Sequence, residues 1–244
     1  MRLITGPPGS GKTAHIQEEF RQALRAKNHS VRLLVPTATM AQHLENQVAR
    51  EGFVLRPGFI QTLNGFVEER VADFPQASEA VVYLLVEEAV QRVNRPEFRR
   101  VAQLSGFCAR LARGILEFSA AGCDSDHLAA HLPDTPLAAA FLEVYQEVDR
   151  ALDRRGLLLR SKRLECAAAR IHHDGLPGIS TVWLDGFHAL PDPELAVIQA
   201  MGRHADLTLT LTEYEATAAL RSRLCNAGFH EEQLGFAAVG AKFG

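Results

Sequence analysis

The sequence has little cysteine, no long apolar run and almost no net charge. Its four cysteines lie far apart and form no Cys-x-x-Cys pair, so they are typical of thiols in a reducing cytoplasm, and no zinc or iron–sulfur site is expected. No apolar run approaches the roughly 20 residues of a membrane-spanning helix. The net charge of −3 gives no overall attraction to nucleic acid, so any such binding must come from local patches.

The chain has ample material for a folded core. Hydrophobic residues make up 47% of its 244 residues, which suits one large domain or two small ones. We find no internal repeat and no low-complexity tract. The N-terminal residues read as a strand followed by a glycine-rich loop, so they do not resemble a signal peptide. We therefore expect a cytoplasmic globular protein.

The most specific pattern is the glycine-rich loop GPPGSGKT, which satisfies the phosphate-binding Walker A pattern at every fixed position. An apolar run precedes it, and a segment with helical periodicity follows it, as the motif requires. Backbone N–H groups of such a loop surround the β-phosphate, the lysine reaches the β- and γ-phosphates, and the hydroxyl ligates Mg²⁺. We therefore expect ATP and Mg²⁺ as cofactors, bound by Gly6, Pro7, Pro8, Gly9, Ser10, Gly11, Lys12 and Thr13.

A phosphate loop needs a partner acid at the carboxyl end of a nearby strand, where α/β proteins bind ligands. The stretch TVWLD supplies Asp185 after three apolar positions, although Asp-Gly is also a common strand-ending turn. Asp206 stands at the start of a strand and fits less well. We therefore predict that Thr13 and Asp185 form the metal side of the site.

The remaining pattern predicts the domain organisation. Short buried strands alternate with helices up to about residue 72 and again from residue 178, whereas residues 73–177 read as consecutive amphipathic helices. The expected fold is α/β: a RecA-like P-loop NTPase core with a parallel sheet, formed by 1–72 plus 178–244. The segment 73–177 is expected to be an inserted all-helical subdomain.

Four stretches follow the order of the first motifs of superfamily-one, UvrD-like helicases: GPPGSGKT, VPTATMAQHLENQVA, FIQTLNGFVEE and VWLDGFHALPDPELAVIQAMGRHADLTLTLT. The chain most resembles the N-terminal part of the B subunit of AddAB-type helicase–nucleases, in which Asp-Gly-Phe replaces Asp-Glu. The resemblance implies a helical insertion in the first motor domain, a role in recombination and DNA repair, an A-type partner subunit, and binding to single-stranded or end-proximal DNA. It also implies a second motor domain and a nuclease domain, which these residues do not contain. The chain is therefore expected to be the N-terminal piece of a longer protein, a trimmed form of one, or a truncated homologue.

Two departures from that family weaken the case for an active enzyme. Residue 186 is Gly where a working helicase has the Glu that activates water, and the stretch after the strand around Thr208 lacks the Gly-Asp and Gln that sense the γ-phosphate. Glu194 and His188 are candidate substitutes for the base. Glu194 more simply begins a helix, where the dipole favours an acid. We therefore expect ATP to be held and poorly hydrolysed.

Candidate DNA contacts come from two sources. In the resembling family, loops after the second and third strands face single-stranded DNA. Arginine-rich stretches in the insertion also suit DNA phosphates, although a solvated helix face explains them equally well. Phe66 could stack on a base of the DNA, but its place in a helical pattern is equally consistent with packing in the core. The candidates are Thr37, Thr39, Thr62, Phe66, Arg154, Arg155 and Arg163.

Two other enzymatic functions remain open. One is a superfamily-one helicase fragment that hydrolyses ATP with a non-standard base. The other is a phosphoryl-transfer kinase with a helical lid, against which the order of the motifs argues. Single-strand-stimulated ATP turnover, measured beside nucleoside phosphorylation, separates these alternatives.

Overall fold

The computed structural model describes residues 1–235, and these fold into two compact units. The core unit comprises Met1–Arg70, Ala167–Leu190 and the chain from Val197, and the helical unit comprises Val71–Cys166 and Pro191–Ala196. The expected insertion, 73–177, ends about ten residues later than the first segment of the helical unit. The expected core residues 236–244 lie outside the described part of the chain.

The core unit is built on a six-stranded sheet in which every neighbouring pair of strands is parallel. The strand order is β3-β2-β4-β5-β1-β6. This α/β architecture confirms the expected fold class of a RecA-like P-loop core with a parallel sheet. The strands are β1 Arg2–Gly6, β2 Val31–Val35, β3 Ile60–Thr62, β4 Thr181–Leu184, β5 Asp206–Thr212 and β6 His230–Gln233.

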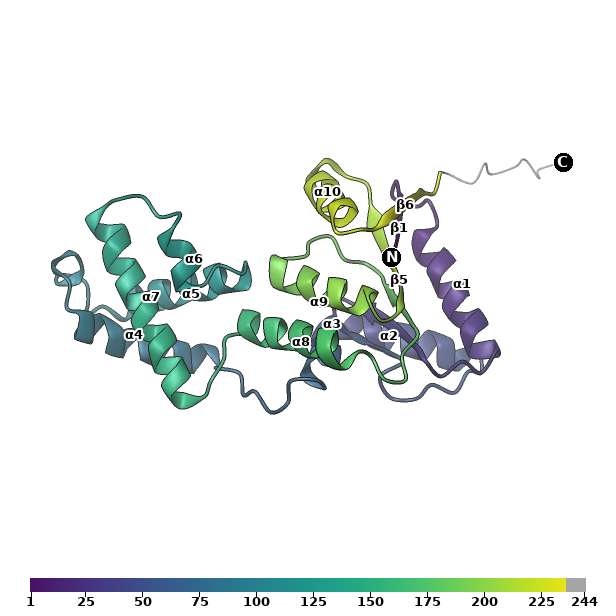
Figure 1. The fold of residues 1–244 in the computed structure, drawn as a ribbon, viewed down its shortest axis with the longest axis horizontal. Coiled ribbons are helices and arrows are strands. Elements are labelled where there is room, and N and C mark those ends of the chain that lie inside the picture. Colours follow the sequence, from purple (N-terminus) through teal and green to yellow (C-terminus); the bar gives the residue numbers. More distant parts are fainter. Residues whose placement is uncertain (236–244) are drawn as a thin grey trace. The chain divides into compact units, whose positions relative to one another are not determined.

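The central strands are buried on both faces, as parallel strands covered by helices must be. Leu3 and Ile4 of β1 are fully buried although they point to opposite faces. Ile4 packs against Ile16 and Phe20 of α1 (Lys12–Arg25). Figure 1 shows α1 on one side of the strands β1 and β5 and α10 (Ala218–Asn226) on the other.

Hydroxyl caps start the short helices that follow β2 and β3. Thr37 accepts a hydrogen bond from the N–H of Met40 at the start of α2 (Ala38–Arg50). Thr62 does the same for Gly65 in α3 (Leu63–Glu68), as its sequence position predicts. The core unit also contains the second part of α8 (Arg160–Asp174) and the second part of α9 (Asp192–Gly202), since each of these helices belongs in part to both units. The short helix η2 (Glu215–Thr217) completes it.

The helical unit has its own apolar core, to which Val86, Ile115, Val144 and Tyr145 contribute. Its elements are α4 Glu79–Val93, η1 Pro96–Phe98, α5 Ser105–Ala120, α6 Ser125–Ala129, α7 Pro136–Arg155 and the first part of α8 (Figure 1). Between residues 96 and 122 the chain forms η1 and α5, with turns between them, and not one continuous helix. The N–H of Ala77 donates to the carbonyl oxygen of Leu158. Residues near the start of the helical unit therefore lie beside residues near the end of its first segment.

None of the helices within residues 1–235 is both long enough and apolar enough to cross a bilayer.

Candidate nucleotide-binding site

The phosphate loop lies between the carboxyl end of β1 and the first turn of α1, which begins at Lys12. Gly11 has φ of 85°, a left-handed conformation that glycine adopts at little cost. A side chain at Gly6 would also clash, because a Cβ there would lie 2.3 Å from the carbonyl oxygen of Leu234. The glycines of GPPGSGKT therefore permit this turn and its close approach to the neighbouring backbone.

Lys12 is directed back into the loop and is only 6% exposed. Its ammonium donates to the carbonyl oxygens of Gly6 and Pro7, both at 2.8 Å, and to the hydroxyl of Ser10 at 3.1 Å. Burial lowers the pKa of Lys12, while the negative charges of Glu213 and Asp185 act in the opposite direction. A buried cation enclosed by a glycine-rich turn is the arrangement that receives phosphate oxygens.

Asp185 lies directly after β4 and is 1% exposed. Its Oδ1 accepts from the hydroxyl of Thr13 at 3.1 Å and from that of Thr210 at 2.5 Å. Its Oδ2 is buried without a hydrogen-bond partner among residues 1–235. Because a buried carboxylate oxygen is costly to leave unsatisfied, this atom suits a hydrated Mg²⁺ held against phosphates. The chemistry of Thr13 and Asp185 therefore fits the metal.

Gly186 occupies the position where the helicases that the sequence resembles have a water-activating glutamate. Its φ is 83°, and a Cβ built there would lie 3.2 Å from Cε and 3.3 Å from Sδ of Met40. The backbone conformation disfavours a larger residue, and the end of the Met40 side chain would have to shift slightly to admit one. The backbone at residue 186 therefore has a left-handed conformation, in which a glutamate would be strained.

Glu194 and His188, the two candidate substitutes for that glutamate, lie in an ion pair and in an exposed loop, respectively. Glu194 belongs to the first turn of α9 and accepts from Arg160 at 2.6 Å, an ion pair within the helical unit. His188 is exposed in the loop between β4 and α9. The ion pair gives Glu194 a structural role in the helical unit.

Glu213 is an acid at the loop that the sequence analysis did not single out. It follows β5 directly, and its N–H donates to the carbonyl oxygen of Gly6 at 2.9 Å. The rule that identified Asp185, an acid just after a buried strand, would also have found Glu213. The helicases that the sequence resembles have Gly-Asp and Gln at this place, so their pattern gives no role to an acid here.

The residues expected to face DNA from the core unit differ in accessibility. Thr37 and Thr39 are exposed at the start of α2, whereas Thr62 is half-buried and caps α3. Phe66 is fully buried, and the guanidinium of Arg70 lies 3.5 Å from the centre of its ring. The base-stacking interpretation of Phe66 is therefore wrong for this conformation, because the ring packs in the core.

The three candidate arginines of the helical unit also differ. Arg163 is 5% exposed and donates to the side chain of Gln76 and the carbonyl of Val71, so its expected DNA contact is not available. Arg155 is paired with Glu88. Arg154 is half-exposed and contacts the carboxylate of Glu147 at 3.2 Å.

Glu147 organises a cluster of arginines that the sequence pattern did not reveal. It is buried in α7, and Arg92, Arg150 and Arg154 all pair with it from more exposed positions. Burial by itself would raise the pKa of Glu147, but hydrogen bonds from Arg92 and Arg154 hold it below its ordinary value. One carboxylate compensates one of three cations, so the cluster, hereafter the Glu147 cluster, keeps a positive excess.

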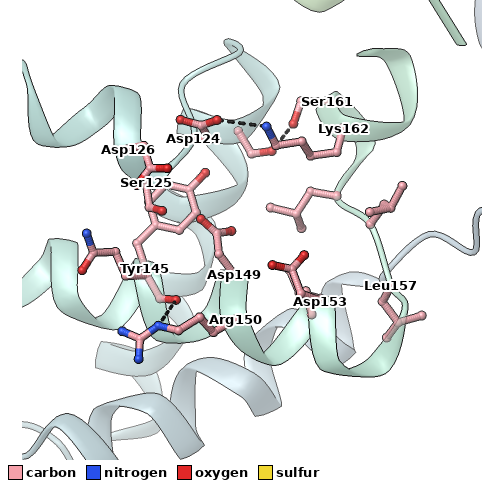
Figure 2. A pocket seen from close by; sticks show the side chains of 15 residues that line it. Asp124, Ser125, Asp126, Tyr145, Asp149, Arg150, Asp153, Leu157, Ser161 and Lys162 are labelled. Atoms are coloured by element: carbon pink, nitrogen blue, oxygen red, sulfur yellow. Dashed lines mark hydrogen bonds and ion pairs between the residues drawn. The ribbon is translucent and has the colours of Figure 1, made fainter. Parts of the chain in front are cut away.

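The helical unit also contains a cavity of about 510 Å³ between α6, α7 and the start of α8 (Figure 2). Asp124, Asp149 and Lys162 line it, and Lys162 donates to Asp124 at 2.9 Å. Burial raises the pKa of Asp149. Within residues 1–235, no three His, Cys, Asp or Glu side chains are grouped to hold a metal ion. None of the phosphate-loop residues lines this cavity, so it is not the nucleotide site.

Comparison with protein families finds a match to part of the chain. A family described as an AAA domain matches residues 1–103, a stretch that includes the phosphate loop and the first three strands but ends before Asp185. No curated protein matches the chain. Together with the parallel sheet, the match supports a P-loop NTPase domain of the helicase-like type, a class that generally binds nucleotide with Mg²⁺.

Proposed function

We propose that this chain is an ATP- and Mg²⁺-binding, helicase-like module that acts on DNA, as the B subunit of a helicase–nuclease does in double-strand-break repair. The observation that carries the nucleotide site is the pairing of Thr13 with Asp185 beside a buried Lys12. Thr13 and Asp185 are 172 residues apart in the sequence and meet at the carboxyl edge of one parallel sheet. Such an edge is where α/β proteins bind their ligands.

Each residue of the site has a separate role toward the nucleotide. The backbone of the loop binds phosphate oxygens, and Lys12 neutralises part of their charge. Thr13 and Asp185 hold the metal, with Thr210 fixing the carboxylate through its hydrogen bond to Oδ1. When bound, Mg²⁺ would supply positive charge that offsets the negative charge of the phosphates. This set of residues is sufficient for binding.

The proposal includes slow hydrolysis. In-line attack on the γ-phosphate requires an oriented water and positive charge on the transferred group, commonly from an arginine. Residue 186 offers no side chain to take the proton of the water, and its left-handed φ of 83° disfavours any replacement. Loss of general-base catalysis alone typically slows such a reaction by about 10²–10⁴-fold.

The proposed partner on the helical unit is the phosphate backbone of DNA, held by the Glu147 cluster. Each of its three arginines contacts the carboxylate of Glu147 within 3.2 Å, and each side chain remains partly exposed to solvent. An arginine already ordered by an ion pair loses less side-chain entropy when it binds a phosphate. An A-type helicase–nuclease subunit is the proposed protein partner.

Replacement of Asp185 by Asn tests the metal side of the site. The Asp185→Asn variant should lose the Mg²⁺-dependent part of ATP binding, because the amide keeps the shape of the side chain but removes its charge. Calorimetric titration of ATP with and without Mg²⁺ measures this difference. Asp206→Asn, at the other end of the neighbouring strand, is the matched control and should bind as the unmodified protein does. Equal Mg²⁺ dependence in Asp185→Asn would refute the assignment.

A further inference from the structure

The cavity between α6, α7 and the start of α8 lies within the helical unit, and no residue of the proposed nucleotide site lines it. Its volume of about 510 Å³ is that of a site for a small molecule, for which about 300–1,000 Å³ is typical. Four aspartates and four leucines contribute to its lining. The cavity therefore offers negative charge and apolar surface together.

Asp149 and Asp153 supply two carboxylates from the same side of α7. A separation of four residues places two side chains next to each other on a helix, and Figure 2 shows both carboxylates projecting into the same space. Asp149 is half-buried, whereas Asp153 is exposed. Within residues 1–235, neither forms an ion pair with a lysine, an arginine or a histidine.

The two cations that line the cavity are engaged with other acids. Lys162 donates to Asp124 at 2.9 Å, as Figure 2 shows, and to Glu165 at 3.2 Å. Arg150 pairs with Glu147 of the Glu147 cluster at 3.0 Å. The charge of Asp149 and Asp153 is therefore not compensated by the lining of the cavity itself.

The surroundings of Asp149 make its negative charge costly. Burial raises the pKa of Asp149, hydrogen bonds from Ser125 lower it, and the negative charges of Asp124 and Asp153 raise it again. Desolvation and like charges both disfavour an ionised carboxylate. A cation placed between Asp149 and Asp153 would offset both effects.

A chain of hydroxyl groups that line the cavity ends in a hydrogen-bond acceptor. Ser119 and Ser161, both buried, share a hydrogen bond of 2.5 Å, and Ser119 also forms one with the hydroxyl of Tyr145. The Tyr145 hydroxyl donates its own proton to the carbonyl oxygen of Cys123 at 3.0 Å. Ser119 must therefore donate to Tyr145, and Ser161 must donate to Ser119. The oxygen of Ser161, like the carboxylates, is left able only to accept.

We propose that this cavity binds a small organic cation, a primary alkylammonium, whose ammonium group donates to Asp149 and Asp153 and whose alkyl chain packs against the leucines. An ammonium group has three donors and no acceptor, which suits a lining whose open polar groups are acceptors. A metal ion fits less well, because no three His, Cys, Asp or Glu side chains of residues 1–235 are grouped to hold one. A free diamine and the lysine side chain of another protein share this chemistry.

The test is calorimetric titration of the whole chain with 1,4-diaminobutane and, separately, with Nα-acetyl-lysine methylamide. Asp149→Asn keeps the shape of the side chain but removes its charge, so it should weaken the binding of the amines by about tenfold. Asp153→Asn should weaken it by about threefold, because this carboxylate is exposed to solvent. Asp134→Asn is the matched control: it removes an exposed carboxylate of the helical unit that does not line the cavity, and it should change nothing.

The outcomes identify the source of the cation or overturn the proposal. Tighter binding of 1,4-diaminobutane supports a free amine, and tighter binding of the lysine derivative supports a side chain of a protein partner. The proposal is overturned if neither amine binds, if Asp149→Asn and Asp153→Asn bind them as the unmodified protein does, or if the uncharged 1,4-butanediol binds equally well. If Asp149→Asn does not fold, as judged by its thermal transition, the exposed Asp153→Asn gives the comparison.

Discussion

At the scale of single residues, Gly186 decides how the site differs from that of a working motor. Its φ of 83° is a conformation that residues with a Cβ rarely adopt, and Met40 and Pro36 lie close to where a side chain would start. A glutamate would therefore be strained in the backbone conformation that Gly186 adopts here.

The variant Gly186→Glu should consequently fail to restore ATP turnover. It should also lower the free energy of unfolding by about 1–3 kcal/mol, the usual cost of a residue forced into a sparsely populated backbone conformation. Thermal or denaturant unfolding and steady-state turnover measure the two effects. Gly186→Ala is the control for strain without charge and should lose about 1–2 kcal/mol. A Gly186→Glu protein that gains turnover without losing stability would contradict the proposed cause.

Sequence patterns predicted some residues of the site, whereas others could be identified only from the order of the strands in the sheet. Asp185 could be found because an apolar strand ends in an acid, and Lys12 because its loop has a fixed spacing. Thr210 could not be found, because its role depends on which strand lies beside β4, and that order is not written in the pattern of one strand. Phe66 and Arg163 were misplaced because neither charge nor aromaticity reveals burial.

At the scale of secondary-structure elements, apolar periodicity was the reliable signal. The strand Thr181–Leu184 coincides with the apolar run before Asp185, whereas β6, with the sequence HEEQ, has no apolar pattern that would predict it. β6 is polar throughout and is held by its backbone pairing with β1 and by the side chains of Glu231 and Gln233. Such a strand depends on tertiary partners that a local pattern does not show.

The Glu147 cluster gives a prediction about α7 and α4. Glu147→Gln should lower the free energy of unfolding by about 1–2 kcal/mol at neutral pH, because charged hydrogen bonds to Arg92 and Arg154 are lost. The folded-state pKa of Glu147 is lowered, so its stabilisation is present above the unfolded pKa and is lost as pH falls through the folded one. The stability difference between the two proteins should thus shrink in acid. A difference that is independent of pH would contradict this role.

The same cluster gives the prediction for DNA. Replacing Arg92, Arg150 and Arg154 together with Gln should flatten the dependence of single-strand affinity on salt, by about 2–3 in the slope of the log–log plot. Fluorescence anisotropy at several salt concentrations measures the slope. Arg113→Gln, which removes another exposed arginine of the helical unit, is the control and should change it little. An unchanged slope in the triple variant would show that these arginines only stabilise α7.

At the scale of the whole molecule, we expect binding of ATP and its hydrolysis to depend on different residues. The core unit places Lys12, Thr13 and Asp185 at one edge of its sheet, the set of residues that we propose binds phosphates and metal. Residues 1–235 provide no glutamate at position 186, and Glu194 is engaged with Arg160. The expected behaviour is therefore tight retention with slow chemistry.

The fate of ATP on an excess of the protein tests this account most directly. Labelled ATP is mixed with Mg²⁺ and single-stranded DNA, and bound ATP and ADP are separated after seconds to minutes. The account predicts that ATP is bound and recovered intact, and that Lys12→Ala weakens binding by about 2 kcal/mol, the loss of one charge-assisted contact. Conversion to ADP at several per second, abolished by Lys12→Ala, would contradict it.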